Sequence, residues 1–291
     1  MRVTESCAKC LFNQQKNLTD DEEYLAEVKA IIEGRDIDDT SPYLVYKINK
    51  SYEARFGKRA SYKDVKRKYN DLVMSMEDDL RKKIENSEDP LFKALVFARI
   101  GNYIDFGAMN NVDEDTFLAL FDDPKMRSED EADIKSLFAQ CKTAKKFLLV
   151  ADNCGEIVLD KLFLEQLGKR YPQLEISVMV RGADVLNDVT LEDAEYVGLS
   201  KKYRIIPNGN SAAGTIYKML SDDARKAIDS TDIILAKGLG NYESMCGQGR
   251  HIFFSFLCKC ELFTSRFNVP RLTGVFVEER IADQDLNGTR C

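Results

Sequence analysis

The chain has 291 residues, a length that allows one large domain or two smaller ones. Apolar residues make up 44% of it and charged residues 31%, which predicts a sizeable core and argues against a long disordered tail. The formal charge of −7 argues against nucleic acid or an anionic membrane as the main partner, because both attract cationic surfaces.

No apolar run approaches the ~20 residues that a membrane-spanning helix needs, and the N-terminus has no apolar signal-peptide segment. We therefore expect a cytoplasmic protein whose eight cysteines are reduced thiols. The single histidine, His251, excludes any site that needs two imidazoles. Metal binding must then use carboxylate, amide or thiolate ligands.

Helices are expected in the first half of the chain, up to about residue 141. Thr19 and Glu22 have the spacing of a capping box, ahead of an apolar stripe that stops at Gly34. A second stripe with steps of three and four residues runs from Val65 to Ile84.

Two further helix starts follow in the same half of the chain. Asp89 and Pro90 have the pattern of an N-cap followed by proline at the first helical position, and they begin an apolar segment that extends to Ile104. Another helix begins near Ser128. The sequence at 113–116 resembles the aspartyl motif of haloacid dehalogenase phosphatases, but no apolar strand precedes it, so we interpret it as a helix start.

After residue 141 the pattern changes to short apolar runs separated by helical stretches, one of them at 156–171. Strands are expected at 147–150, 176–180, 204–206, 233–236 and 274–277. Such alternation predicts a mainly parallel sheet covered by helices on both faces. The predicted architecture is α/β, with a helical domain (1–141) packed on a three-layer α/β/α Rossmann-like sandwich (142–291).

Ligands of open α/β sheets bind beyond the carboxyl ends of the strands. The first predicted strand is followed by Asp152 and Asn153, and the loop after the second strand contains Asp188. Their oxygens suit a hard divalent cation such as Mg²⁺ or Mn²⁺. Alternatively, Asp152 and Asn153 are an N-cap and turn, because both residue types favour caps.

Phosphate binding is suggested by Lys237, which follows a buried strand, together with the backbone N–H groups near Gly155 and Gly238. The alternative for this segment is a tight strand-to-helix turn. Asn102 and Asp105, three residues apart on one helix face, either reach into a cleft between the domains or mark a helix end.

Four cysteines form a less specific pattern, a C-x-x-C and a distant C-x-C. They provide either a structural zinc site or unliganded thiols. The cysteines concerned are Cys7, Cys10, Cys258 and Cys260.

Taken together, these motifs resemble the damage-control phosphatases, the family also called domain of unknown function 89, in its stand-alone microbial branch with an N-terminal C-x-x-C. The matching segments are 7–10, 101–107, 151–156, 186–190 and 237–243. The resemblance implies hydrolysis of small phosphate monoesters, such as sugar phosphates or damaged phosphometabolites, with one divalent ion. Mn²⁺ or Mg²⁺ is expected, with Ni²⁺ and Co²⁺ as further candidates.

The resemblance also implies roles for individual residues. Asp152, Asn153 and Asp188 match the metal ligands, Lys237 matches the phosphate-contacting lysine, and Glu156 matches the glutamate of the motif. Substrate contacts are expected from Asn102, Asp105, Gly155, Gly238 and Asn241.

Direct attack by water is the expected mechanism, with either Asp188 or Glu156 orienting that water. This rests on the resemblance and on the lack of a recognisable aspartyl, seryl or histidyl nucleophile motif. The alternatives are a transferase that binds a nucleotide or S-adenosylmethionine, and a non-catalytic protein that binds a phosphorylated metabolite.

Overall fold

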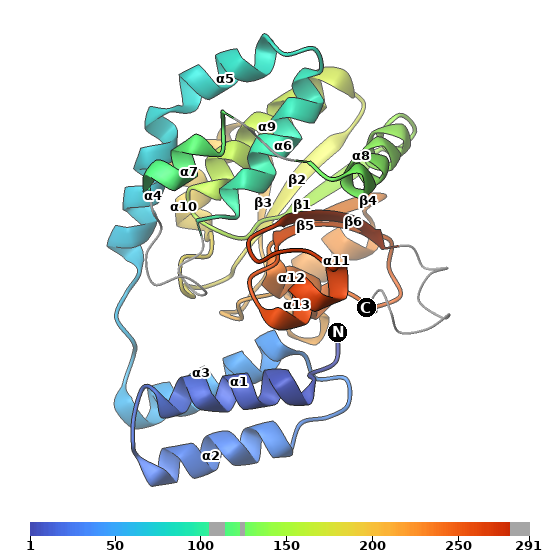
Figure 1. Cartoon of the computed structure of the whole chain (residues 1–291). Helices are drawn as coiled ribbons and strands as arrows, with labels where there is room; N and C mark the ends of the chain where they lie inside the picture. The colour runs from blue at the N-terminus through green and yellow to red at the C-terminus, as the bar shows by residue number, and fades with distance from the viewer. Residues whose placement is uncertain (105–113, 123–125, 280–291) are drawn as a thin grey trace.

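The computed structural model describes residues 1–104, 114–122 and 126–279 (Figure 1). Within these residues six strands form one sheet in the order β3-β2-β1-β4-β5-β6. The first five strands run parallel, and β6 pairs antiparallel with β5 at the edge. The strands are β1 (Lys146–Val150), β2 (Glu175–Val180), β3 (Arg204–Pro207), β4 (Ile233–Lys237), β5 (Ile252–Leu257) and β6 (Gly274–Glu279).

The α/β class and the mainly parallel sheet are confirmed. All five predicted strands are present, but β5 was missed by the sequence analysis. All six of its residues are buried, as expected for a strand with helices on both sides. Its apolar run, interrupted only by Ser255, is the signal that was available.

The sheet has a separate hydrophobic core on each face. Alternate residues of β1 divide between these cores: Phe147 and Leu149 face one, Leu148 and Val150 the other. The first core also contains residues of α6 (Pro90–Gly101) and α9 (Glu156–Arg170), and the second contains residues of the helices after β3. This gives the three layers seen in Figure 1, as predicted. The helices on the second face are α11 (Asp222–Asp229), α12 (Leu239–Met245) and α13 (Glu261–Phe267).

The helices between residues 63 and 141, which also precede the sheet in sequence, join the first core, which extends from Tyr69 to Phe276. The predicted N-cap of α6 is confirmed, because the Asp89 carboxylate accepts a hydrogen bond from Phe92 N at 3.1 Å. These helices are α4 (Lys63–Ser75), α5 (Glu77–Glu85), α6, α7 (Glu114–Ala119) and α8 (Ser128–Cys141); the short α10 (Leu191–Tyr196) follows β2.

The helix α8 precedes β1 in sequence but packs against β6, the last strand. The carboxylate of Asp130 accepts a hydrogen bond from Phe276 N at 3.1 Å, and the carboxylate of Asp133 accepts one from Glu278 N at 3.2 Å. These bonds join segments about half the chain length apart.

The first three helices have a small core of their own, made by residues such as Tyr24, Val28 and Leu44. They form a layer beside the main body (Figure 1). The predicted boundary at residues 141 and 142 stays a prediction; the cores group α4 to α8 with the sheet and leave these three helices apart. They are α1 (Glu5–Lys16), α2 (Glu22–Glu33) and α3 (Ser41–Phe56).

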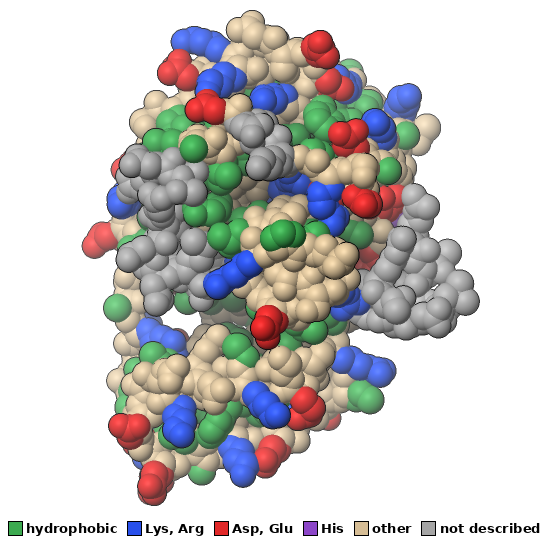
Figure 2. Space-filling view, viewed as in Figure 1, with side chains coloured by type: hydrophobic (Ala, Val, Ile, Leu, Met, Phe, Trp, Pro, Cys, Tyr) green, Lys and Arg blue, Asp and Glu red, His purple; other side chains and the backbone are tan. Residues whose placement is uncertain are grey.

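Between this layer and the main body lies a cavity of about 850 Å³, lined by Thr40 and Tyr43 on one side and by Ser244 and Arg266 on the other. None of the predicted site residues lines it. On the face drawn in Figure 2, acidic and basic side chains are interspersed.

Two helix predictions need correction. The stripe from Val65 to Ile84 belongs to two helices, α4 and α5, which meet at Met76. The N-cap of α2 is Asp21, not Thr19, because the Asp21 carboxylate accepts the hydrogen bond from Tyr24 N at 2.8 Å. No helix in the described ranges is long and apolar enough to cross a membrane.

Candidate active site

Two loops meet at the carboxyl edge of the sheet and bring the predicted metal ligands together. Asn153, just after β1, forms a β-bridge with Asp188, from the loop after β2. Val189 N donates to Asp152 O at 2.8 Å, and Cys154 N donates to Asn187 O at 2.9 Å. The backbone thus fixes both loops before any side chain contributes.

The carboxylates at this edge are largely buried: Asp152 is 8% exposed and Asp188 is 4% exposed. The Asp152 Oδ2 atom accepts hydrogen bonds from Asn153 Nδ2 at 2.7 Å and from Asn102 Nδ2 at 3.0 Å. Two aspartates in an almost dry site need a nearby cation, because burying an unpaired charge is costly.

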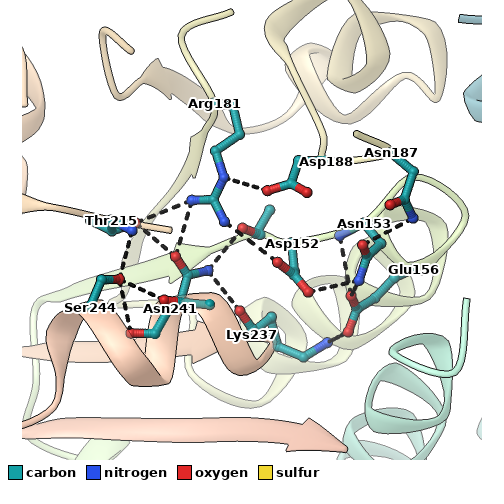
Figure 3. A network of polar contacts seen from close by, with 12 residues as sticks. Asp152, Asn153, Glu156, Arg181, Asn187, Asp188, Thr215, Lys237, Asn241 and Ser244 are labelled. Atoms are coloured by element: carbon teal, nitrogen blue, oxygen red, sulfur yellow. Dashed lines mark hydrogen bonds and ion pairs between the residues drawn. The ribbon is translucent and has the colours of Figure 1, made fainter. Parts of the chain in front are cut away.

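Arg181, the first residue after β2, is that cation (Figure 3). Its Nε donates to Asp188 Oδ2 at 2.6 Å, and its Nη2 lies 3.5 Å from Asp152 Oδ1. No role was predicted for this residue from the sequence. An arginine at a strand end, on the edge where two aspartates gather, is the signal that was available.

Lys237, the last residue of β4, is fully buried, and its ammonium lies against the acidic side chains of α9. Its Nζ donates to Glu156 Oε1 at 2.6 Å, Asp160 Oδ1 at 2.7 Å and Ala98 O at 2.9 Å. An ammonium has three hydrogens, so all three are engaged within the chain. The expected contact between Lys237 and a phosphate would require one of these bonds to break.

The charges of this triad shift one another. Burial lowers the pKa of Lys237, but the neighbouring carboxylates of Asp160 and Glu156 outweigh that effect, and the net pKa is raised. Burial raises the pKa of Asp160 to about 7; Lys237 counteracts this rise and Glu156 adds to it. One ammonium therefore faces two carboxylates, and a proton is held more tightly here than in water.

The two glycines expected to offer N–H groups to a phosphate have other partners. Gly155 N donates to Asn70 Oδ1 at 2.7 Å, and Gly238 N donates to Ser255 O at 2.9 Å. Gly238 instead makes room for the Asp152 carboxylate: with φ at +79°, a Cβ on it would lie 1.9 Å from Asp152 Oδ2. A side chain at this position would push the carboxylate away.

The amides of Asn102 and Asn241 are likewise engaged inside the protein. Asn102 ends α6, donates to Asp152 and to Glu156 Oε2, and accepts from Leu257 N at 3.1 Å. Asn241 Oδ1 accepts from Arg181 Nη1 at 3.0 Å. Asp105 lies outside the described residues. Both asparagines thus hold the charged side chains in place through hydrogen bonds.

The chemistry of the donors fits a hard cation. Asp152, Asp188 and Asn153 offer oxygen, the ligand atom that Mg²⁺ and Mn²⁺ prefer. Beside them the Oδ1 atom of Asn187 is buried without a hydrogen-bond partner, while its Nδ2 donates to Asn153 Oδ1 and Ile104 O, both at 3.0 Å. A buried acceptor without a donor is uncommon and is satisfied by a cation or a water.

The zinc alternative is not supported. In the described ranges, no group of three or more histidine, cysteine, aspartate or glutamate side chains is arranged to hold a metal. The four cysteines concerned are free thiols; Cys258 is buried with its Sγ near Phe263 O, whereas Cys10 is exposed on α1. His251 lies apart from the site and contacts Glu278.

The fold and the site define a three-layer α/β/α protein in which two buried aspartates lie close together at the carboxyl edge of the parallel strands. Residues 2–273 match the damage-control phosphatase ARMT1-like domain, so the chain belongs to this family.

Individual proteins agree with this membership. A damage-control phosphatase of Archaeoglobus fulgidus is 28% identical over 97% of this chain and 99% of its own length. A damage-control phosphatase of Pyrococcus horikoshii is 28% identical over 72% of this chain and 71% of its own. The crystal structure of a DUF89 family protein from Pyrococcus horikoshii superposes with a TM-score of 0.76. It covers 96% of this chain and 100% of that one at 23% identity, and so supports the fold.

Proposed function

We propose that this protein is a divalent-metal-dependent phosphatase that hydrolyses small phosphate monoesters, such as sugar phosphates or damaged phosphometabolites. The observation that carries the proposal is the pair of buried aspartates, Asp152 and Asp188, held side by side at the carboxyl edge of the sheet. Family membership and the relatives named damage-control phosphatase agree with it.

Asp152, Asn153 and Asp188 would hold the ion, which we expect to be Mn²⁺ or Mg²⁺ because all three offer oxygen. When bound, a divalent ion supplies a Lewis acid for a phosphoryl oxygen and lowers the pKa of a water. The unpartnered oxygen of Asn187 supports the same assignment, because it adds a fourth oxygen next to Asn153.

The attacking group in this proposal is water, and the contacts of the two candidate carboxylates favour Asp188 as the residue that orients it. Glu156 is completely buried. Its Oε1 pairs with Lys237, and its Oε2 accepts from Asn102 and Asn153. A carboxylate in this position acts on its neighbours rather than on the substrate. We therefore assign Glu156 and Lys237 the task of fixing the amides of Asn102 and Asn153.

Phosphate release tests the proposal directly. Purified protein is freed of metal with a chelator and then assayed against a panel of sugar phosphates, with and without Mn²⁺. Release of inorganic phosphate that requires the added ion is expected. No release from any monoester under any metal would contradict the proposal and favour a transferase or a binding protein.

The mechanism has its own test, hydrolysis of a substrate that is chiral at phosphorus. Direct attack by water inverts the configuration, whereas a phosphoenzyme gives net retention through two inversions. Retention would overturn the direct attack and leave the phosphatase activity standing.

A further inference from the structure

We propose that Arg181 is a positioning residue that holds Asp152 and Asp188 in the geometry of metal ligands. The inference rests on the proposed function, since it assumes that these two carboxylates bind the ion. Arg181 begins the loop after β2 that also carries Asp188, and its guanidinium lies between the two aspartates (Figure 3).

The guanidinium is anchored on the side away from Asp188. Its Nη1 donates to Asn241 Oδ1 at 3.0 Å and to Thr215 Oγ1 at 3.3 Å. Thr215 Oγ1 in turn donates to Asn241 Oδ1 at 2.9 Å. Arg181 thus contacts four side chains from four separate segments.

The anchor itself is fixed to the backbone of two strand ends. Asn241 Nδ2 donates to Lys237 O at 2.7 Å and to Ala151 O at 3.2 Å, so its Oδ1 can only face the guanidinium. Thr215 N donates to Ser244 Oγ at 2.8 Å. These hydrogen bonds fix Asn241 relative to the sheet edge. Asn241 in turn fixes Arg181, and Arg181 fixes the two aspartates.

Burial removes any alternative arrangement for this side chain. The Arg181 side chain is 1% exposed, so it cannot swing into solvent as a surface arginine would. Only a planar fork with five donors reaches acceptors on several sides at once; a lysine ammonium is a single point charge. The shape of the guanidinium, and not its charge alone, is what fits this place.

Charge and position make opposite predictions for metal binding. As a cation, Arg181 repels a divalent ion, so its charge alone would weaken binding. As a support for ligands, it strengthens binding, because side chains that orient metal ligands typically contribute about 10–100-fold to affinity. The geometry leads us to expect the second effect to prevail.

The test is Mn²⁺ affinity measured by calorimetry on the metal-free full-length protein, without substrate. Arg181→Lys keeps the charge and removes the fork, and we expect it to weaken Mn²⁺ binding by about 10–100-fold. Thr215→Val removes only one anchor and should weaken binding in the same direction by less. Arg99→Lys is the matched control: Arg99 is also buried and its ion pair is with Asp130, so this variant should bind Mn²⁺ like the wild type.

The outcomes separate the two proposals. If the wild type binds Mn²⁺ and Arg181→Lys binds it as tightly or more tightly, the positioning role is overturned and the proposed function stands. If Arg181→Lys does not fold, Thr215→Val decides, and unchanged affinity in that variant rejects the role. If the wild type binds no divalent ion, the metal-dependent function fails and this inference fails with it.

Discussion

The turn after β1 and the turn after β4 look alike in the sequence. Each has a charged residue at a strand end, then a glycine with positive φ, then a helix. Asp152 in the first turn joins the cluster of oxygens at the sheet edge, whereas Lys237 in the second is wholly buried and engages three acceptors inside the protein. The same local pattern thus supplies candidate ligands in one turn and a supporting framework in the other.

What distinguishes the two turns is the partner that each charged group meets. Asp152 accepts hydrogen bonds from the amides of Asn102 and Asn153, and one guanidinium nitrogen lies 3.5 Å from its carboxylate. Lys237 meets two carboxylates on α9, Glu156 and Asp160, one helical turn apart. A motif therefore predicts where a charge will lie more securely than what it will contact.

The largest expected effect is in the turn after β1, which contains Asp152. Asp152→Asn keeps the shape of the side chain and removes its charge. A divalent ion held by Asp152, as proposed, would supply several kcal/mol of charge stabilisation, so turnover should fall by about three orders of magnitude or more. Phosphate release measures the loss. Asp232→Asn is the control, because Asp232 accepts from Lys145 N and Lys146 N at the opposite edge of the sheet. Near-normal turnover in Asp152→Asn would show that Asp152 is not a metal ligand.

In the turn after β4, the substitution Lys237→Met leaves Glu156 and Asp160 buried without their cation. Breaking a buried pair in this way costs about 3–5 kcal/mol of stability. Urea unfolding measures it, with Lys169→Met as the control for an exposed pair, for which about 0–1 kcal/mol is expected. A variant as stable as the wild type but inactive would instead favour the direct phosphate contact that the motif predicted.

Gly238→Ala tests the contact between the two turns. The new Cβ would overlap the Asp152 carboxylate, and a ligand displaced by about 1 Å can cost a hundredfold in turnover. Gly155→Ala shares the positive φ, but its Cβ would meet the end of the Ile104 side chain at 2.8 Å and Tyr69 O at 3.2 Å. Equal turnover in the two variants would show that backbone strain, and not the clash with Asp152, is responsible.

The smallest effect concerns pH. Burial raises the pKa of Asp160 to about 7, whereas an unfolded aspartate titrates near 3.9. The native state therefore binds more protons in this window, and stability contributed by the protonated form declines as pH rises from about 4 to 7. Asp160→Asn cannot titrate, so its stability should vary less with pH across this window. Urea unfolding at several pH values compares the slopes; identical slopes would contradict the assignment.

Much of the fold follows from the sequence, because the strands are short apolar runs and the residues just after them necessarily share one edge of the sheet. For this reason the sequence predicts that Asp152, Asn153 and Asp188 lie at one edge of the sheet. The contacts of Lys237 could not be predicted in this way, since Ala98 and Asp160 lie in other segments and only packing decides which acceptors an ammonium meets. The sequence did contain a signal for Asp160, because it is an acidic residue within the apolar face of a helix, four residues after Glu156.

The pairing of α8 with β6 has a consequence for how the chain is made. The backbone N–H groups that Asp130 and Asp133 bind belong to residues 276 and 278, which leave the ribosome long after α8 does. Until then the Asp130 carboxylate, completely buried in the finished protein, lacks one of its hydrogen-bond donors. Contacts this distant in sequence slow folding, and the helices that emerge first must wait with apolar surface uncovered. A chain that stops short of β6 is thus expected to interact with chaperones through the half of the protein that was synthesised first.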